Sequence, residues 1–152
     1  MPVEDWTPTV ADVGAVLRSR TVNRHGAELG TFTAETRPTE AQVLLLVPGA
    51  TGAVAAVIGD DVAEEWHDDA AGIAAIGTAM QIELTYYPEQ IGTGRSPYDE
   101  LKELYEDRLR DLRAAIIGGG GDLPAGEGDE APPDSPVMYA PDRTMLGFGT
   151  LW

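Results

Sequence analysis

The sequence predicts an all-α fold: a compact bundle of about four helices, a long loop after the first helix and an extended C-terminal tail. Apolar residues recur at spacings of three and four in successive segments, which is the period of an α-helix. Three of these segments open with a capping-box pattern. Alternation typical of a strand is confined to one short stretch. Together these observations favour a helical bundle over a β-rich fold.

The first helix is expected to begin at Thr9, because Thr9 and Asp12 form a capping-box pattern. Its apolar face consists of Val10, Val13 and Leu17, with Val16 beside them. The segment from Arg18 to Pro38 that follows is too long for an idle connection in a compact domain. Alternation within it allows a short strand pair at Leu29, Thr31 and Thr33.

The second helix is expected to begin at Thr39, with Gln42 completing the capping box, and to end at Gly59. Pro48 lies inside it, lacks an N–H and clashes with the carbonyl of Leu44. A kink or a helix in two pieces is therefore expected. The apolar stripe of this helix is Val43, Val47, Ala50, Val54 and Val57.

The third helix is apolar on nearly every side and ends at Pro88. Its two stripes are Trp66, Ala70, Ile73, Gly77, Met80, Leu84 and Tyr87, and then Ile76, Ala79 and Ile82. Such a helix is buried on several sides. Because a domain this small is not expected to supply all of that cover, the pattern predicts oligomerisation. The expected core or subunit-contact residues are Trp66, Ile73, Ile76, Met80, Leu84 and Tyr87.

The fourth helix is expected to begin at Ser96, with Pro97 at its first position and Asp99 completing a capping box. Charges of both signs occupy its other faces, which is typical of a partly solvated helix. Its single apolar stripe is Leu101, Tyr105, Leu109, Leu112 and Ile116.

Composition divides the chain into a helical domain at 1–117, a flexible acidic Gly/Pro linker at 118–136 and an apolar C-terminal arm at 137–152. The linker cannot bury enough apolar surface to offset its ordering entropy. The arm carries the aromatic types that anchor interfaces, so it is expected to bind a partner or a neighbouring subunit. The alternative is that it folds back onto its own domain. The expected binding residues are Met138, Tyr139, Leu146, Phe148, Leu151 and Trp152.

Charge and composition exclude several functions. The chain has 10 Lys and Arg against 26 Asp and Glu, a net charge of −16, so tight binding to DNA or RNA is not expected. It has no cysteine, which excludes disulfides and thiolate catalysis. No secretion signal pattern opens the sequence, so a cytoplasmic product is expected. No apolar run is judged to approach the roughly 18 residues of a membrane span.

The sequence predicts no enzyme, no catalytic residue, no metal and no cofactor. His67 precedes two aspartates, but a metal site needs more converging ligands, and the other histidine, His25, lies in a loop. The glycines at 118–121 lack the Lys-Ser/Thr ending of a phosphate loop. Glu83, deep in an apolar stretch, is expected to pair with an arginine rather than to act as a general base.

Three strings in order resemble the head-to-tail adaptors, or head-completion connectors, of long-tailed bacteriophages. Gly30 to Thr39 (GTFTAETRPT) leads into the second helix, and Met80 to Gln90 (MQIELTYYPEQ) closes the third. Ser96 to Ile117 forms a final helix of mixed charge, and the apolar tail after a loose linker resembles those proteins in style. The interruption at Pro48 departs from the pattern.

The resemblance implies a structural virion protein at the head-tail junction, assembled in the host cytoplasm. It would form a homo-oligomeric ring, usually dodecameric, between the portal protein and the stopper or head-closure connector. DNA would pass through the lumen during ejection without tight binding, and no membrane would be involved. One alternative is another phage neck or tail-completion protein. The other is a small helical regulatory or enzyme subunit with an autoinhibitory tail.

Overall fold

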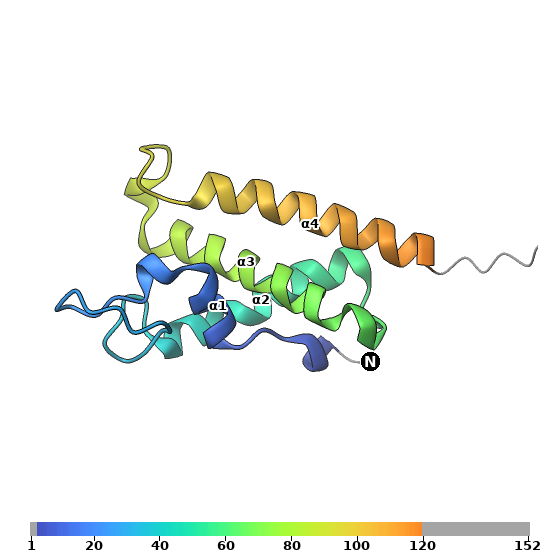
Figure 1. Ribbon diagram of the computed structural model, residues 1–152, viewed down its shortest axis with the longest axis horizontal. Coiled ribbons are helices and arrows are strands. Elements are labelled where there is room, and N and C mark those ends of the chain that lie inside the picture. Colours follow the sequence, from blue (N-terminus) through green and yellow to red (C-terminus); the bar gives the residue numbers. More distant parts are fainter. Residues whose placement is uncertain (1–2, 120–152) are drawn as a thin grey trace, which may run out of the picture. The chain divides into compact units, whose positions relative to one another are not determined.

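The computed structural model describes residues 3–119 of the 152-residue chain. The described part is helical, as predicted, and contains no strand (Figure 1). Its α-helices are α1 (Val10–Val16), α2 (Glu40–Ile58), α3 (His67–Tyr86) and α4 (Tyr98–Gly119). Short 3-10 turns accompany them: η1 (Val3–Trp6), η2 (Arg18–Arg20), η3 (Glu64–Trp66) and η4 (Pro88–Gln90).

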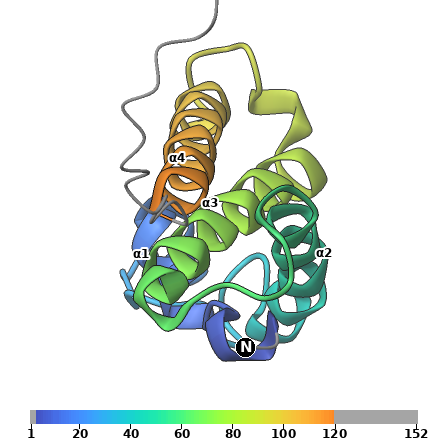
Figure 2. The same cartoon turned by 90° about the vertical axis from the view of Figure 1, so that its right-hand side faces the viewer.

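Helix α3 lies at the centre of the bundle, with α1, α2 and α4 packed around it (Figure 2). Gly77 lets two of these helices approach closely. A Cβ at that position would lie 3.1 Å from the Tyr105 ring on α4 and 3.4 Å from the Ala50 Cβ on α2. The buried residues of α3 are Ala70, Ile73, Ala74, Ala75, Ile76, Thr78, Ala79, Ile82 and Glu83.

The apolar core consists of two clusters that share α3. The first gathers α1, the start of α2 and the middle of α3 around Phe32 from the loop, and Leu101 of α4 closes it. The second joins Trp6 of η1 and Val62 to the end of α2 and the start of α3, with Leu112 of α4. Each helix therefore contributes most of its apolar stripe to one interior.

Both predicted N-terminal caps of the first two helices are confirmed. Thr9 and Asp12 form the capping box of α1, and Thr39 and Gln42 form that of α2. Helix α2 runs without interruption through Pro48, so a helix in two pieces is wrong. The carbonyl of Leu44 loses the hydrogen bond that residue 48 would donate, but the flanking turns hold the helix together.

The fourth helix begins later than predicted, at Tyr98 rather than Ser96. Ser96 still supports this end, because its Oγ accepts a hydrogen bond from the backbone N–H of Tyr98 at 3.2 Å. The same hydroxyl donates to Glu83 Oε2 at 2.7 Å, so it serves two partners. The predicted stripe is confirmed: Leu101 and Leu112 are buried, and Tyr105, Leu109 and Ile116 pack against the clusters.

The strand pair expected in the loop is wrong. A single antiparallel bridge joins Val22 and Glu28, next to the residues that alternate. The loop instead packs onto α1, where a Cβ at Gly14 would lie only 3.0 Å from the Thr31 Cα. Phe32 then enters the core with 1% of its surface exposed. The loop is held by these contacts and by turns, not by a strand ladder.

Two residues predicted to face the interior are exposed. Leu84 keeps 49% of its surface exposed and Val57 keeps 39%. In the last turns of α3 the interior is occupied by Ile82 and Glu83, and Leu84 lies about 100° further around the helix. Helices α1, α2 and α4 cover most of α3, but Ala71 and Gly72 near its start remain partly exposed.

Candidate docking surfaces

Beyond its first turn, the outer face of α2 is exposed and apolar. Leu45 has 80% of its surface exposed and Leu44 has 52%. The opposite side of the helix is buried, with Val43 and Val54 at 0%. We call the exposed set the α2 outer face: Ala41, Leu44, Leu45, Pro48, Gly49, Gly52, Ala53, Ala56 and Val57.

No charged side chain interrupts this face. Between Glu40 and Asp60 the chain has no Asp, Glu, Lys or Arg; the polar Thr51 is buried, and the exposed Gln42 lies in the first turn, where it accepts a hydrogen bond from the Thr39 backbone N–H. By contrast, the segment that follows α2 and the part of α4 from Asp99 to Arg113 carry charges at close intervals. An exposed apolar face of this extent is typical of a surface that binds another molecule.

Helix α2 is also long and apolar enough to cross a membrane by length and composition alone, with a mean hydropathy of 2.0. The expectation that no apolar run approaches that length is therefore wrong. The same test is passed by core helices of soluble proteins, and a third of this window is buried inside the protein. Its geometry, with one side packed on α3, is that of a core helix whose other side lacks a cover.

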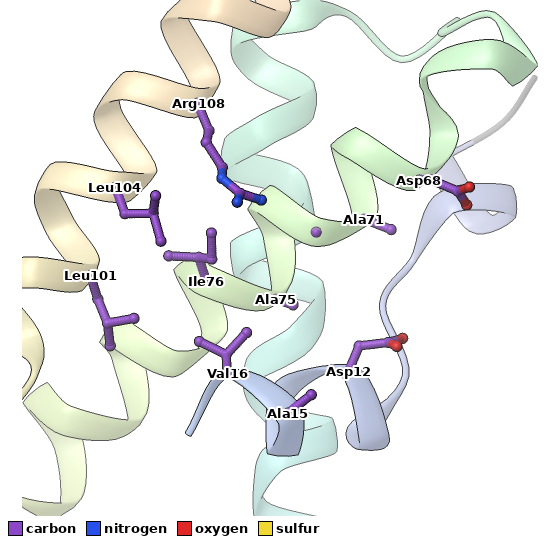
Figure 3. A pocket seen from close by; sticks show the side chains of 11 residues that line it. Asp12, Ala15, Val16, Asp68, Ala71, Ala75, Ile76, Leu101, Leu104 and Arg108 are labelled. Atoms are coloured by element: carbon purple, nitrogen blue, oxygen red, sulfur yellow. The ribbon is translucent and has the colours of Figure 1, made fainter. Parts of the chain in front are cut away.

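A groove opens on the other side of α3, between α1 and α4 (Figure 3). Helix α2 lies behind α3 in that view. The groove has a volume of about 590 Å³. Its floor and walls are apolar, with Asp12, Asp68 and Arg108 at its edges, and the apolar lining is Ala15, Val16, Ala71, Gly72, Ala75, Ile76, Leu101 and Leu104.

The groove continues along α3 towards the end of α4. A second hollow of about 370 Å³ is lined by Trp66, Ile73, Leu112 and Ala115, with Asp69 and Asp111. Arg108 lines both hollows, so they lie next to each other on one side of the bundle. The small side chains of Ala71, Gly72 and Ala75 leave the space that a further helix fills in a larger bundle.

A buried ion pair lies at the C-terminal end of α3. Glu83 has no exposed surface, and its carboxylate accepts two hydrogen bonds from Arg20: 2.7 Å from Nε and 2.8 Å from Nη2. Arg20 also donates to Gln90 Oε1 at 2.9 Å. With the Ser96 hydroxyl, these bonds satisfy Glu83, and the predicted pairing of Glu83 with an arginine is confirmed.

Tyr87 completes this network. The Arg20 guanidinium stacks 3.8 Å from the centre of the Tyr87 ring, and the Tyr87 hydroxyl donates to the Arg37 carbonyl. The hydrogen bonds that Arg20 donates to Glu83 raise the pKa of Arg20, and burial opposes that shift. Burial raises the pKa of Tyr87, although Arg20 and Arg37 oppose that shift. The network joins α3, η2, η4 and the start of α4, and its groups are occupied with one another, which is the arrangement of a structural pair.

The predicted contact residues fall in different places. Ile73 and Ile76 are buried, whereas Met80 and Tyr87 pack partly buried against the first cluster and Trp66 against the second. The arm residues Met138, Tyr139, Leu146, Phe148, Leu151 and Trp152 lie outside the described residues.

His67 hydrogen-bonds the Val62 carbonyl at 3.0 Å through Nε2. Across residues 3–119 no three His, Asp or Glu side chains are grouped to hold a metal ion.

Neither the α2 outer face nor the groove was predicted from the sequence. A signal for the first was present: Leu44-Leu45-Leu46 with no charge on any side from Ala41 to Ile58. That pattern resembles the one in α3, and composition alone does not tell which of two apolar helices takes the centre. The groove had no signal in the sequence, because it depends on how far α1 extends along α3.

Comparison with protein-family models, with curated proteins and with solved structures found no match to this chain.

Proposed function

We propose that this protein is a structural subunit of a homo-oligomeric ring, of the kind that joins the capsid portal to the tail-side connector of a long-tailed bacteriophage. The observation that carries the proposal is the α2 outer face, an exposed apolar helix surface on a chain of net charge −16. The resemblance of the three sequence strings to phage adaptors is the reason for placing the ring between the portal and the tail-side connector.

Charge explains why self-assembly would use this face. Two copies of so acidic a chain repel each other wherever their carboxylates face. The α2 outer face has no charge to repel, and its leucines lose contact with water when a neighbour covers them. Association through it therefore combines the smallest electrostatic cost with a large apolar gain.

The acidic remainder suits a DNA channel. Carboxylates of η3 and of the first turn of α3 are exposed: Glu64, Glu65, Asp68 and Asp69. A wall of such groups repels phosphates, so DNA would pass through the lumen without being held. A subunit with a basic surface would bind the passing DNA and slow its exit.

The arm at 137–152 would bind the portal protein. Its aromatic side chains are of the types that dominate interface energies, and a ring presents one arm per subunit. Several weak contacts made together give an avidity that a single contact lacks.

The test is electron microscopy of the full chain, alone and mixed with a portal protein, followed by co-sedimentation with portal-bearing heads. Rings that sediment with the heads are expected. Phe148→Ala with Trp152→Ala should leave the rings intact and release them from the heads. A protein that forms no ring under any condition, or turnover of a nucleotide that survives purification and is lost in a Glu83 variant, contradicts the proposal.

A further inference from the structure

We propose that the α2 outer face of one copy packs into the groove between α1, α3 and α4 of the next copy. The inference rests on the proposed function, because it names the subunit contact of the ring. Its occupant is a second copy of this chain, and its contact residues are Leu44, Leu45 and Pro48 on one side and Ala15, Ala71 and Leu104 on the other.

The two surfaces match in shape and in chemistry. The α2 outer face is a ridge that carries the most exposed leucine of the described chain, Leu45, at 80%. The groove is a hollow with an apolar floor, and Leu104 at its wall is 41% exposed. A helix that lies in an apolar groove is a common mode of recognition, and here it would supply the missing neighbour of both surfaces.

The distribution of charge favours the α2 outer face as the occupant of the groove. The edges of the groove carry Asp12 and Asp68 against Arg108, so an acidic segment of another copy would be repelled there. The α2 outer face brings no carboxylate between Ala41 and Ile58. Among the helices of the described part, α2 is the one that offers a ridge without charge.

The position of the surfaces sets the symmetry. They lie on opposite sides of α3, since α2 is behind α3 where the groove faces the viewer (Figure 3). A contact between two different surfaces is heterologous, and repeated head to tail it closes into a ring or extends as a filament. A contact of α2 with α2 would instead stop at a dimer.

A lipid surface is a weaker occupant for α2. Helices that lie on membranes carry Lys and Arg on the polar side, and anionic lipids repel acidic proteins. Helix α2 has no basic residue, and acidic residues flank it on both ends. The side of α2 opposite the outer face packs against α3, so it is not free to face water as the polar side of a membrane-surface helix does.

The experiment uses the absence of cysteine, because every introduced thiol is then unique. Leu45→Cys and Leu104→Cys are made in the full chain, singly and together, and treated with a short bis-maleimide reagent. Mixed single variants should cross-link to dimers, and the double variant should give a ladder of oligomers. Lys102→Cys replaces Leu104→Cys as the matched control, because two residues along α4 turn it by about 200° away from the groove. That control should give only background.

Several results overturn the inference. A dimer formed by Leu45→Cys alone shows an α2–α2 contact. Cross-linking of Leu104→Cys with Phe148→Cys, but not with Leu45→Cys, shows that the arm fills the groove. Flotation of the wild type with vesicles of phosphatidylcholine and phosphatidylglycerol, lost in Leu45→Glu, shows that lipid covers α2. Oligomers by native mass spectrometry without a ladder overturn the inference alone, whereas a monomer at all concentrations overturns the proposed function as well.

Discussion

Helices α2 and α3 have similarly apolar compositions, but the rest of the chain covers them to different extents. Both are nearly free of charge through their middle turns. Helix α3 is covered by α1, α2 and α4, and it buries even the carboxylate of Glu83. Helix α2 packs one side on α3 and leaves two leucines more than half exposed on the other. The larger uncovered apolar face is therefore on α2, whereas α3 is uncovered only where it forms the floor of the groove.

The difference shows what apolar composition measures. It reports how much of a helix must leave water, not which chain provides the cover. In α3 most of the cover is intramolecular, so its buried residues determine the stability of the monomer. In α2 the inner side does the same, and the outer side contributes only when a second molecule covers it.

Removal of the Glu83 carboxylate should have the largest effect on folding. Glu83→Ala leaves the Arg20 guanidinium, 14% exposed, without its partner inside the protein. Loss of one member of a buried pair costs about 3–5 kcal/mol of unfolding free energy. Urea unfolding measures the change, with Glu106→Ala, which breaks an exposed pair with Lys102, as the control. A loss for Glu83→Ala no greater than for the control would show that the network does not hold the end of α3.

Truncation of an inner residue of α3 should come next. Ile73 is 2% exposed in the second cluster, so Ile73→Ala should cost about 2–5 kcal/mol through lost burial and the cavity left behind. The matched change on the other helix is Leu45→Ala, which should stay within about 0.5 kcal/mol in the monomer. Chemical denaturation at low protein concentration compares the two. Equal losses would contradict the division between α2 and α3.

Leu84 tests which side of α3 faces the interior near the end of that helix. Because half of its surface is exposed, Leu84→Ala should change stability much less than Ile82→Ala, two residues earlier and fully buried. The expected values are below about 1 kcal/mol for Leu84 and about 2–5 kcal/mol for Ile82. Thermal melts of both variants measure the two losses of stability. A larger loss at Leu84 would restore the stripe predicted from sequence.

The smallest effect concerns alkaline pH. Burial raises the pKa of the Tyr105 phenol above its ordinary value of 10.0. The folded state therefore favours the neutral phenol, and its contribution to stability is complete below about pH 10 and is lost as the pH rises through the folded pKa. Tyr105→Phe should flatten this decline in a series of unfolding curves from pH 8 to 11. An unchanged slope would indicate that Tyr105 does not titrate differently on folding.

The fold was predictable where local chemistry decides it. The caps at Thr9 and Thr39 and the stripe of α4 follow from short-range hydrogen bonds and helical period. The pairing of Glu83 was predictable because a buried carboxylate needs a partner, but its identity, Arg20, was not, because 63 residues separate them. The loop was mispredicted because alternation also suits a segment that lies against α1. Contacts between helices decide the exposure of Leu84 and Leu45, and a single helix does not encode them.

The most direct test of the central claim is the mass of the native assembly in two matched variants. Leu45→Glu places a charge on the α2 outer face, and Leu29→Glu makes the same change at a leucine of the loop that is 37% exposed. Sedimentation velocity of the full chain should show an oligomer for the wild type and for Leu29→Glu, and a folded monomer for Leu45→Glu. An oligomer that persists in Leu45→Glu, or a wild type that is monomeric at every concentration, would contradict the account.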